Sequence, residues 1–231
     1  ISVNATSTLG AVVTYTAPEG EDNCTPTTTL IAGPASGGTF PIGITTVTYQ
    51  VKDAGNNTAQ ASFTVTVTGI APEIVVPTNI SVSNDAGICG AVVNYTATET
   101  TGIPASTITY DIQPGSLFTI GSVTVTATAT NEVGTSTKTF TVNVNDNEAP
   151  TAIAKDISID LDTNGNASIT PAMIDNGSSA LCGGNLTLIL SKIKFSCADL
   201  GNNTVTLTVT DAQGIPMEGV SIFVKSNPSN K

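Results

Sequence analysis

The chain has 231 residues, with 18 Asp and Glu against seven Lys and Arg, so its net charge at pH 7 is -11. So few basic residues exclude a nucleic-acid partner, because neutralising phosphates requires clustered Lys and Arg. The chain has no His, which removes the usual general base and the commonest transition-metal ligand. No stretch approaches the ~20 apolar residues of a membrane span. We therefore expect no enzyme activity and no membrane insertion.

An internal repeat organises the chain. The eight residues of 10–17, GAVVTYTA, return at 90–97 as GAVVNYTA, with seven identical positions and an offset of 80. Alternating small and β-branched residues with a tyrosine are typical of a strand. Such self-similarity predicts tandem units of just under 80 residues. We expect the Val and Tyr side chains of this octet to lie in a core.

In chain order, the first predicted unit has strands at 1–3, 10–17, 45–51 and 61–67. Asp53-Ala-Gly-Asn56 predicts a hairpin turn between the last two. The second unit repeats the order, since Phe118-Thr-Ile-Gly121 matches Phe40-Pro-Ile-Gly43. It begins with 71–77, which has no counterpart before Ile1. We therefore expect the first unit to lack its first strand, and the chain, which shows no signal peptide, to be an interior fragment.

The third predicted unit is a diverged relative of the other two. Strands are predicted at 157–161 and 167–170, with a hairpin turn at Asn164-Gly165. Further on, 201–212 matches 43–54, and 221–225 is the predicted closing strand. Polar-out, apolar-in alternation with frequent turn signals predicts an all-β fold. We expect three tandem immunoglobulin-like antiparallel β-sandwich domains in an elongated rod, at 1–69, 70–146 and 147–231.

These residues carry a family resemblance. GAVVTYTAPEGEDNC, GTFPIGITTVTYQVKDAGNNTAQASFTVTV and APEIVVPTNISVSNDAGICGAVVNYTA resemble the hyalin repeat, or HYR, domain. In the third unit, ISIDLDTNGNASITPAMIDNGSSALCGG and FSCADLGNNTVTLTVTDAQG are similar to repeats of the giant SprB-like gliding-motility adhesins. The resemblance implies an immunoglobulin-like fold, export by type IX secretion to the bacterial outer surface, and a role in cell adhesion.

The cysteines depart from the HYR pattern, in which a Cys of Gly-x-Cys-Gly pairs with one of Asp-Asn-Cys. The first unit keeps Cys24 but has Leu9 at the other position, and the second keeps Cys89 without a partner. We expect both to be unpaired and buried as small apolar groups, with a Cys24–Cys89 bridge as the alternative. Cys182 and Cys197 stand where the related repeats have their cysteines. The resemblance implies a disulfide between them; two buried thiols are the alternative.

The linker between the second and third units resembles the calcium-binding joint of cadherins. Asn145, Asp146, Asn147 and Glu148 offer oxygen ligands, so Ca²⁺ is the one cofactor candidate. A polar turn with solvated charges is the alternative. The run 160–165, DLDTNG, begins like an EF-hand loop, but its twelfth position is Pro171 rather than Glu, which favours a turn.

Three functions fit the sequence. The first is a non-enzymatic structural or adhesive segment of a secreted cell-surface fibre, whose partners are neighbouring repeats of the same chain. The second is a polysaccharide-binding module, although the ten Phe and Tyr residues are needed for the cores. The third is an accessory segment of a secreted enzyme.

Overall fold

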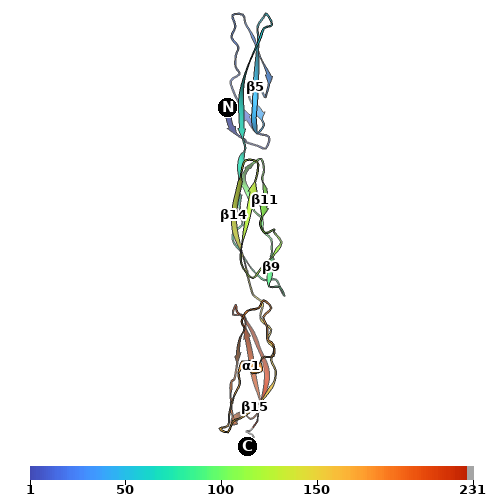
Figure 1. Ribbon diagram of the computed structural model, residues 1–231, viewed down its shortest axis with the longest axis vertical. Coiled ribbons are helices and arrows are strands. Elements are labelled where there is room, and N and C mark those ends of the chain that lie inside the picture. The colour runs from blue at the N-terminus through green and yellow to red at the C-terminus, as the bar shows by residue number, and fades with distance from the viewer. Residues whose placement is uncertain (228–231) are drawn as a thin grey trace. The chain divides into compact units, whose positions relative to one another are not determined.

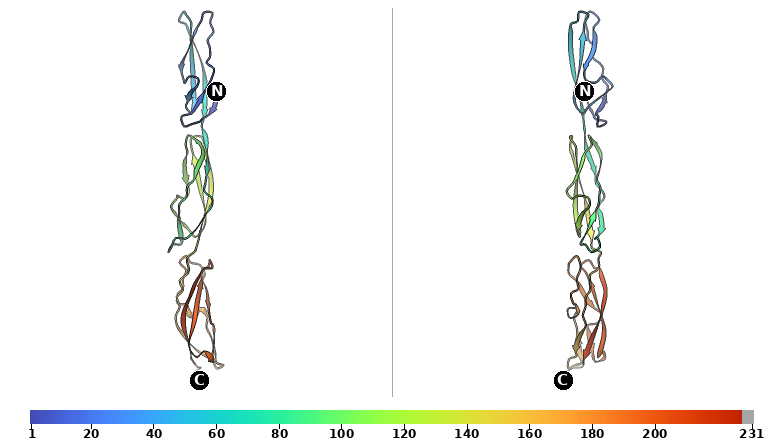
Figure 2. Two further views of the ribbon diagram at one scale, coloured as in Figure 1. Left: turned by 180° about the vertical axis from the view of Figure 1, so that it is seen from behind. Right: turned by 90° about the vertical axis from the view of Figure 1, so that its right-hand side faces the viewer.

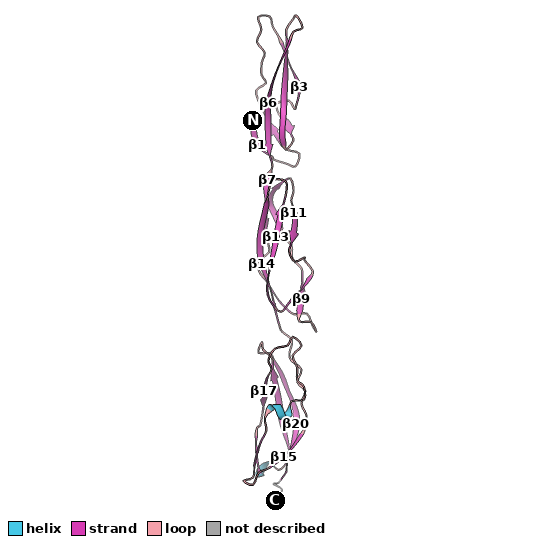
Figure 3. Ribbon diagram, in the orientation of Figure 1, coloured by secondary structure: helices cyan, strands magenta, loops and turns pink. Residues whose placement is uncertain are grey.

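Strands make up almost all the regular structure of the computed structural model, which describes residues 1–227 (Figure 3). The described strands form three four-stranded sheets and four two-stranded ones. Figure 2 shows, from two further sides, that the strands of each larger sheet run side by side. The predicted all-β, sandwich-like architecture is therefore confirmed. No helix of the described residues is long and apolar enough to cross a bilayer.

The first large sheet has the order β1-β6-β5-β3. Its strands are β1 (Ser2–Asn4), β3 (Thr27–Ala32), β5 (Gly43–Lys52) and β6 (Thr58–Thr68). Beside it, β2 (Ala11–Val13) pairs with β4 (Gly38–Phe40). The octet is thus a strand only in its first half.

The second large sheet has the matching order β8-β14-β13-β11. Its strands are β8 (Ile80–Ser83), β11 (Thr107–Tyr110), β13 (Gly121–Thr130) and β14 (Thr135–Asn145). Two smaller pairs accompany it: β9 (Gly90–Val93) with β12 (Ser116–Thr119), and β7 (Ile70–Val75) with β10 (Thr98–Ile103). β5, β9, β11 and β14 are labelled in Figure 1.

The third large sheet has the same order again, β15-β20-β19-β17. Its strands are β15 (Ile157–Asp160), β17 (Thr187–Leu190), β19 (Gly201–Thr210) and β20 (Pro216–Asn227). β16 (Asn166–Ser168) pairs with β18 (Lys194–Ser196), and two short helices, α1 (Pro171–Ile174) and η1 (Cys197–Asp199), complete the described elements.

The prediction of purely antiparallel sheets is wrong for one pair in each large sheet. β1 runs parallel to β6, β8 parallel to β14, and β15 parallel to β20. Each parallel pair joins an early strand to a late strand far along the chain, so no hairpin turn dictates their relative direction. The signal that a hairpin offers in sequence is therefore missing at these three pairs.

Two hairpin predictions have opposite outcomes. The turn at 53–57 joins β5 to β6, which pair antiparallel over their full length, as predicted. The turn at Asn164-Gly165 also forms, with the Asp162 carboxylate accepting from Asn164 N at 2.8 Å and from Asn166 N at 2.9 Å. The flanking strands, however, pair with β20 and β18 rather than with each other. At this turn the chain passes from the third large sheet to the β16–β18 pair, so the predicted second hairpin does not form.

Burial follows the strand alternation. In the octet, Val13 and Val93 are buried, whereas Val12 and Val92 are more than half exposed, because adjacent side chains point to opposite faces. The prediction that all its Val residues lie in a core is therefore wrong for two of the four. The cores are aliphatic with few aromatics. Phe40 is fully buried in the core cluster that also contains Val47, and Phe195 is almost fully buried in the cluster that also contains Leu207.

Gly10, the first residue of the octet, is required by close packing. A Cβ built there would lie 1.8 Å from the carbonyl oxygen of Phe40, and the backbone has φ +113°. A Cβ at the equivalent Gly90 would lie 2.4 Å from the carbonyl oxygen of Phe118. The repeated Gly therefore lets the octet strand approach the backbone of its partner strand.

The chain divides into two compact units, and each is made of several chain segments. One comprises Ile1–Asn79, Asn94–Pro114 and Thr124–Thr141, and the other Ile80–Val93, Gly115–Val123 and Val142–Lys231. The domain boundaries at 69/70 and 146/147 stay predictions.

Candidate functional site

The candidate sites are the two segments that lead from one large sheet to the next. The first joint consists of Gly69 and Ile70 with the residues packed against them. A Cβ at Gly69 would meet the Ile103 carbonyl oxygen at 2.5 Å and a Val133 methyl at 2.6 Å, so the chain passes without room for a side chain. The Asn131 amide donates to the carbonyl oxygens of Ile70 and Pro104, both at 2.8 Å. Hydrogen bonds to the backbone therefore hold this joint.

Ile103 makes the apolar contact of the first joint. It lies at the end of β10 and packs, half-buried, against the core cluster that contains Phe40 and Val67. Sequence reasoning missed this residue. Its only signal is an apolar residue at the end of a polar, Thr-rich stretch.

Carboxylates and amides hold the second joint, which we define as 145–148 with the loop 84–89. Both carboxylate oxygens of Glu148 accept from Gly87 N, at 3.1 and 3.2 Å. Asn147 N donates to the Asn84 side-chain oxygen at 2.9 Å. Asp146 accepts from Glu148 N at 3.2 Å. The linker is thus hydrogen-bonded back onto the loop before β9.

Asn145, the remaining predicted calcium ligand, is bonded within the sheet. Its amide nitrogen donates to Ser81 Oγ at 3.0 Å, and its side-chain oxygen accepts from Asn143 at 2.8 Å. In the described part of the chain, no group of three or more His, Cys, Asp or Glu side chains is placed to hold a metal. The four candidate residues come together at one joint through protein hydrogen bonds, and calcium there stays a prediction.

The Cys182 thiol also lies at the second joint. Burial raises the pKa of this thiol to about 12, together with an interaction with the Cys89 thiol and the negative charges of Asp146 and Glu148. The Cys182 thiol is therefore protonated at neutral pH and is a poor nucleophile.

All four cysteines are free in the structure, and the disulfide between Cys182 and Cys197 stays a prediction. Cys182 follows the bridge between Thr151 and Ser179, and its thiol interacts with that of Cys89. Cys197 begins η1, and its sulfur lies 3.8 Å from the Gly165 carbonyl oxygen at a turn. The two cysteines have different surroundings because the fold separates the segments that carry them. Cys24 is exposed rather than buried as predicted, and its pairing state stays a prediction.

The octet tyrosines anchor the end of their strand in both copies. Tyr15 packs edge-on against Phe63 at 5.0 Å and 72°, and Tyr95 packs against Phe140 with the same values. Tyr15 donates its hydroxyl to Pro34 O at 2.8 Å, and Tyr95 donates to the Ile112 carbonyl oxygen. Burial and the neighbouring Tyr49 hydroxyl raise the pKa of Tyr15 to about 12.

Carboxylates outside the joints close turns. Asp53 accepts from the backbone and the side chain of Asn57, both at 2.8 Å, and these bonds lower its pKa. Burial pushes the pKa of Asp111 upward, but bonds from Thr126 N and Ile112 N outweigh it and leave the pKa lowered. Such acceptors order loops without forming a reactive pair.

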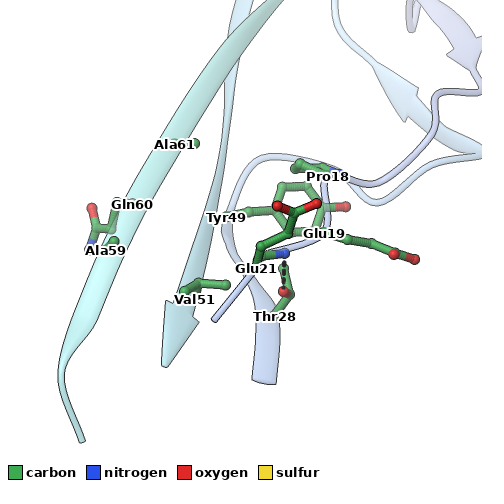
Figure 4. Close-up of a pocket in the computed structure, with 10 residues that line it drawn as sticks. Pro18, Glu19, Glu21, Thr28, Tyr49, Val51, Ala59, Gln60 and Ala61 are labelled. Carbon is green, nitrogen blue, oxygen red and sulfur yellow. Dashed lines mark hydrogen bonds between the residues drawn. The ribbon is translucent and has the colours of Figure 1, made fainter. Parts of the chain in front are cut away.

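A shallow pocket of about 260 Å³ lies between the loop that contains Pro18–Glu21 and the first large sheet (Figure 4). Tyr49 and Val51 of β5 form part of its apolar lining, together with Ala59 and Ala61 of β6. Glu19 and Glu21 lie at its edge, and Gly20 N donates to Thr28 Oγ1 at 3.1 Å. With one aromatic ring and no basic group in its lining, the pocket offers little to an anionic ligand.

The fold defines the chain as an all-β module of repeated sheets with hydrogen-bonded joints. The HYR domain model matches residues 3–67 and 70–144, more than half of the chain, and the chain belongs to this family. It is 38% identical over 125 residues to hyalin from Strongylocentrotus purpuratus and 32% identical over 126 residues to hyalin from Lytechinus variegatus. These matches cover 50% and 51% of this chain, but only 10% and 24% of the two relatives.

Solved cadherin structures are also similar. Drosophila N-cadherin EC1-3 matches with TM-score 0.40 and 10% identity, covering 99% of this chain and 97% of that one. A protocadherin gammaB7 EC3-6 structure matches with TM-score 0.41 and 15% identity, covering 98% and 71%. These likenesses are weak and concern the fold alone.

Proposed function

We propose that the chain is a non-catalytic, load-bearing spacer of an extracellular, adhesion-type protein, built from repeats at 1–69, 70–146 and 147–231 arranged as a rod. HYR membership and the hyalin relatives support the extracellular assignment. The observation that carries the mechanical role is the parallel pairing of an early and a late strand in each large sheet.

Parallel pairing determines how a pulling force acts on the hydrogen bonds. Val3 in β1 stands opposite Val67 in β6, and Val82 in β8 stands opposite Val144 in β14. Pulling the chain from its two ends draws the strands of each such pair past one another. All the hydrogen bonds of the pair are then loaded together, because they lie across the direction of the force. A hairpin pulled at its open ends instead loses its bonds one after another.

The test compares two pulling geometries on the same protein by single-molecule force spectroscopy. In one, handles are attached at the chain ends; in the other, at positions 44 and 66, which stand opposite one another at the open end of the β5–β6 hairpin, where force peels β5 from β6. We expect unfolding from the ends to require several-fold more force at equal loading rate. Equal forces in the two geometries would refute the load-bearing role.

We further propose that the parent protein is a surface fibre of a gliding bacterium, exported by type IX secretion. The likeness of 157–184 and 195–214 to repeats of gliding-motility adhesins supports this assignment. Antibody against residues 147–231 should label filaments on intact cells. Labelling confined to the cell interior would contradict the proposal.

The alternative of a polysaccharide-binding module is supported only by the pocket around Tyr49. A glycan array with the whole chain and with Tyr49→Ala separates the two ideas. Binding that this substitution removes would favour the module, and the spacer predicts no binding above background.

A further inference from the structure

The second joint brings two cysteines from distant parts of the chain together. Glu148 binds Gly87 N through both carboxylate oxygens, and Asn147 binds Asn84. Cys89 lies two residues beyond Gly87 and directly before β9. The hydrogen bonds of the linker therefore fix the position of the segment that carries Cys89.

A second set of bonds positions Cys182. Thr151 and Ser179 exchange backbone hydrogen bonds of 2.7 and 2.9 Å, and Ile153 N donates to Ser178 Oγ at 3.0 Å. Gly183 N donates to the Ala180 carbonyl oxygen at 3.2 Å, which closes a turn with Cys182 inside it. The turn that carries Cys182 thus lies at the start of the third large sheet's chain segment, beside the linker.

The exposure of the four cysteines separates them into two kinds. Cys89 and Cys182 are half-buried and lie close enough for their thiols to interact, whereas Cys24 and Cys197 are exposed. From this geometry we propose that Cys89 and Cys182 form a disulfide in the oxidised protein, which links the loop before β9 to the turn 180–183 across the second joint.

The chemistry of the step is a thiol oxidation, and it is slow at neutral pH because the Cys182 thiol is protonated there. Each thiol loses one proton and one electron, and a bond forms between the two sulfurs. The two electrons and two protons pass to a disulfide oxidant such as oxidised glutathione, which becomes two thiols. The bond would bridge a long stretch of chain, so it would restrict the unfolded state strongly. It would also add a covalent link where Glu148 supplies only hydrogen bonds.

The test uses the whole chain and a tryptic map. The seven basic residues are all lysines, and cleavage after them places each cysteine in a different peptide: Cys24 in 1–52, Cys89 in 53–138, Cys182 in 156–192 and Cys197 in 195–225. The protein is incubated with oxidised glutathione, the remaining thiols are alkylated without reduction, and the digest is read by mass spectrometry.

We expect peptide 53–138 linked to peptide 156–192, with Cys24 and Cys197 not linked to any other peptide and recovered either alkylated or as mixed disulfides with glutathione. Cys182→Ser should leave Cys89 not linked to any other peptide, and the matched control Cys24→Ser should leave the link unchanged. A link between 156–192 and 195–225 would overturn the proposal. So would Cys89 and Cys182 that both stay unlinked after oxidation, whether alkylated or carrying glutathione.

A thermal measurement gives an independent readout. Oxidation should raise the melting temperature of the wild-type chain and leave that of Cys182→Ser unchanged. A rise of equal size in both proteins would show that the stabilisation comes from another reaction. Because the oxidant is supplied in the tube, this result does not depend on the proposed spacer function or location.

Discussion

Replacing Gly10 by Ala tests why the octet begins with glycine. The matched control is Gly43→Ala. Both glycines have φ near +110°, but a Cβ at Gly43 would meet nothing within 4 Å, whereas a Cβ at Gly10 would lie 1.8 Å from the Phe40 carbonyl oxygen. The control therefore measures the backbone cost alone, and the difference between the two variants measures the close approach of β2 to β4.

The expected magnitudes follow from that geometry. Alanine in a sparsely populated positive-φ conformation costs about 1–3 kcal/mol, offset by about 0.4–1 kcal/mol from its lower entropy in the unfolded chain. Gly43→Ala should therefore lower the free energy of unfolding by about 1–2 kcal/mol. Gly10→Ala must in addition move two backbones apart by more than about 1 Å, which breaks strand hydrogen bonds of about 0.5–1.5 kcal/mol each and loosens the packing of Phe40. We expect its total cost to be about 2–4 kcal/mol larger.

Urea unfolding followed by tyrosine fluorescence measures both variants, because Tyr15 lies 6.2 Å from the Phe40 ring. Hydrogen exchange of the amides at 11–13 locates the effect. Gly10→Ala should accelerate their exchange far more than Gly43→Ala does. Equal losses of stability in the two variants would refute the reasoning, since the shared φ would then account for the whole effect.

Three further predictions concern charge. The pKa values of Asp111 and Asp175 are lower in the folded state than in the unfolded state. The stability that these two carboxylates contribute is therefore present above pH ~4 and is lost as the pH falls through their folded-state pKa values. The urea concentration at the midpoint of unfolding should stay constant from pH 8 to 5 and then drop. The folded-state pKa of Tyr15 is about 12, so its contribution is complete below pH ~10 and lost as pH rises towards 12; absorbance at high pH follows its ionisation, and titration near 10 would contradict the packing. If the second joint binds calcium, the wild-type chain should melt at a higher temperature in Ca²⁺ than in chelator, and Glu148→Gln should not. The matched control Glu132→Gln should behave like the wild type. The same melting temperature of the wild-type chain in both solutions would exclude calcium binding at this joint.

The strand content and the repeat were readable from sequence because both are local signals. Alternation in 61–67 and 140–144 places every second side chain on one face, and β6 and β14 follow it. The turn at 53–57 joins neighbours in the chain, so its residues suffice to predict the hairpin. The parallel partners of β1 and β8 carry no such signal. β1 pairs with β6, and β8 with β14, only after the rest of each large sheet has positioned the later strand.

The two joint segments carry a sequence signal, but their chemistry could not be predicted from it. Pro and polar residues mark 69–72 and 145–150, and the ligand-like oxygens of 145–148 suggested a cation. Asn147 and Glu148 form hydrogen bonds with the loop residues Asn84 and Gly87. These two loop residues lie some sixty residues earlier in the chain and belong to no recognisable sequence pattern. A carboxylate that accepts backbone N–H groups and one that binds calcium look alike in a sequence. Only the fold shows which donors reach it.

The cysteines show how one position can change partners between repeats. The residue before the octet is Leu9 in the first copy, 75% exposed, and Cys89 in the second, half-buried at a joint. Because this position lies at the surface of its repeat, its side chain can reach a neighbouring segment as readily as its own core. The HYR pattern uses the position for a bridge within one repeat, and the partner for that bridge is absent from 98–106. A cysteine that has lost its partner at such a surface position can therefore bond to a neighbouring segment of the chain. Cys182, in the turn 180–183, is the cysteine that interacts with Cys89.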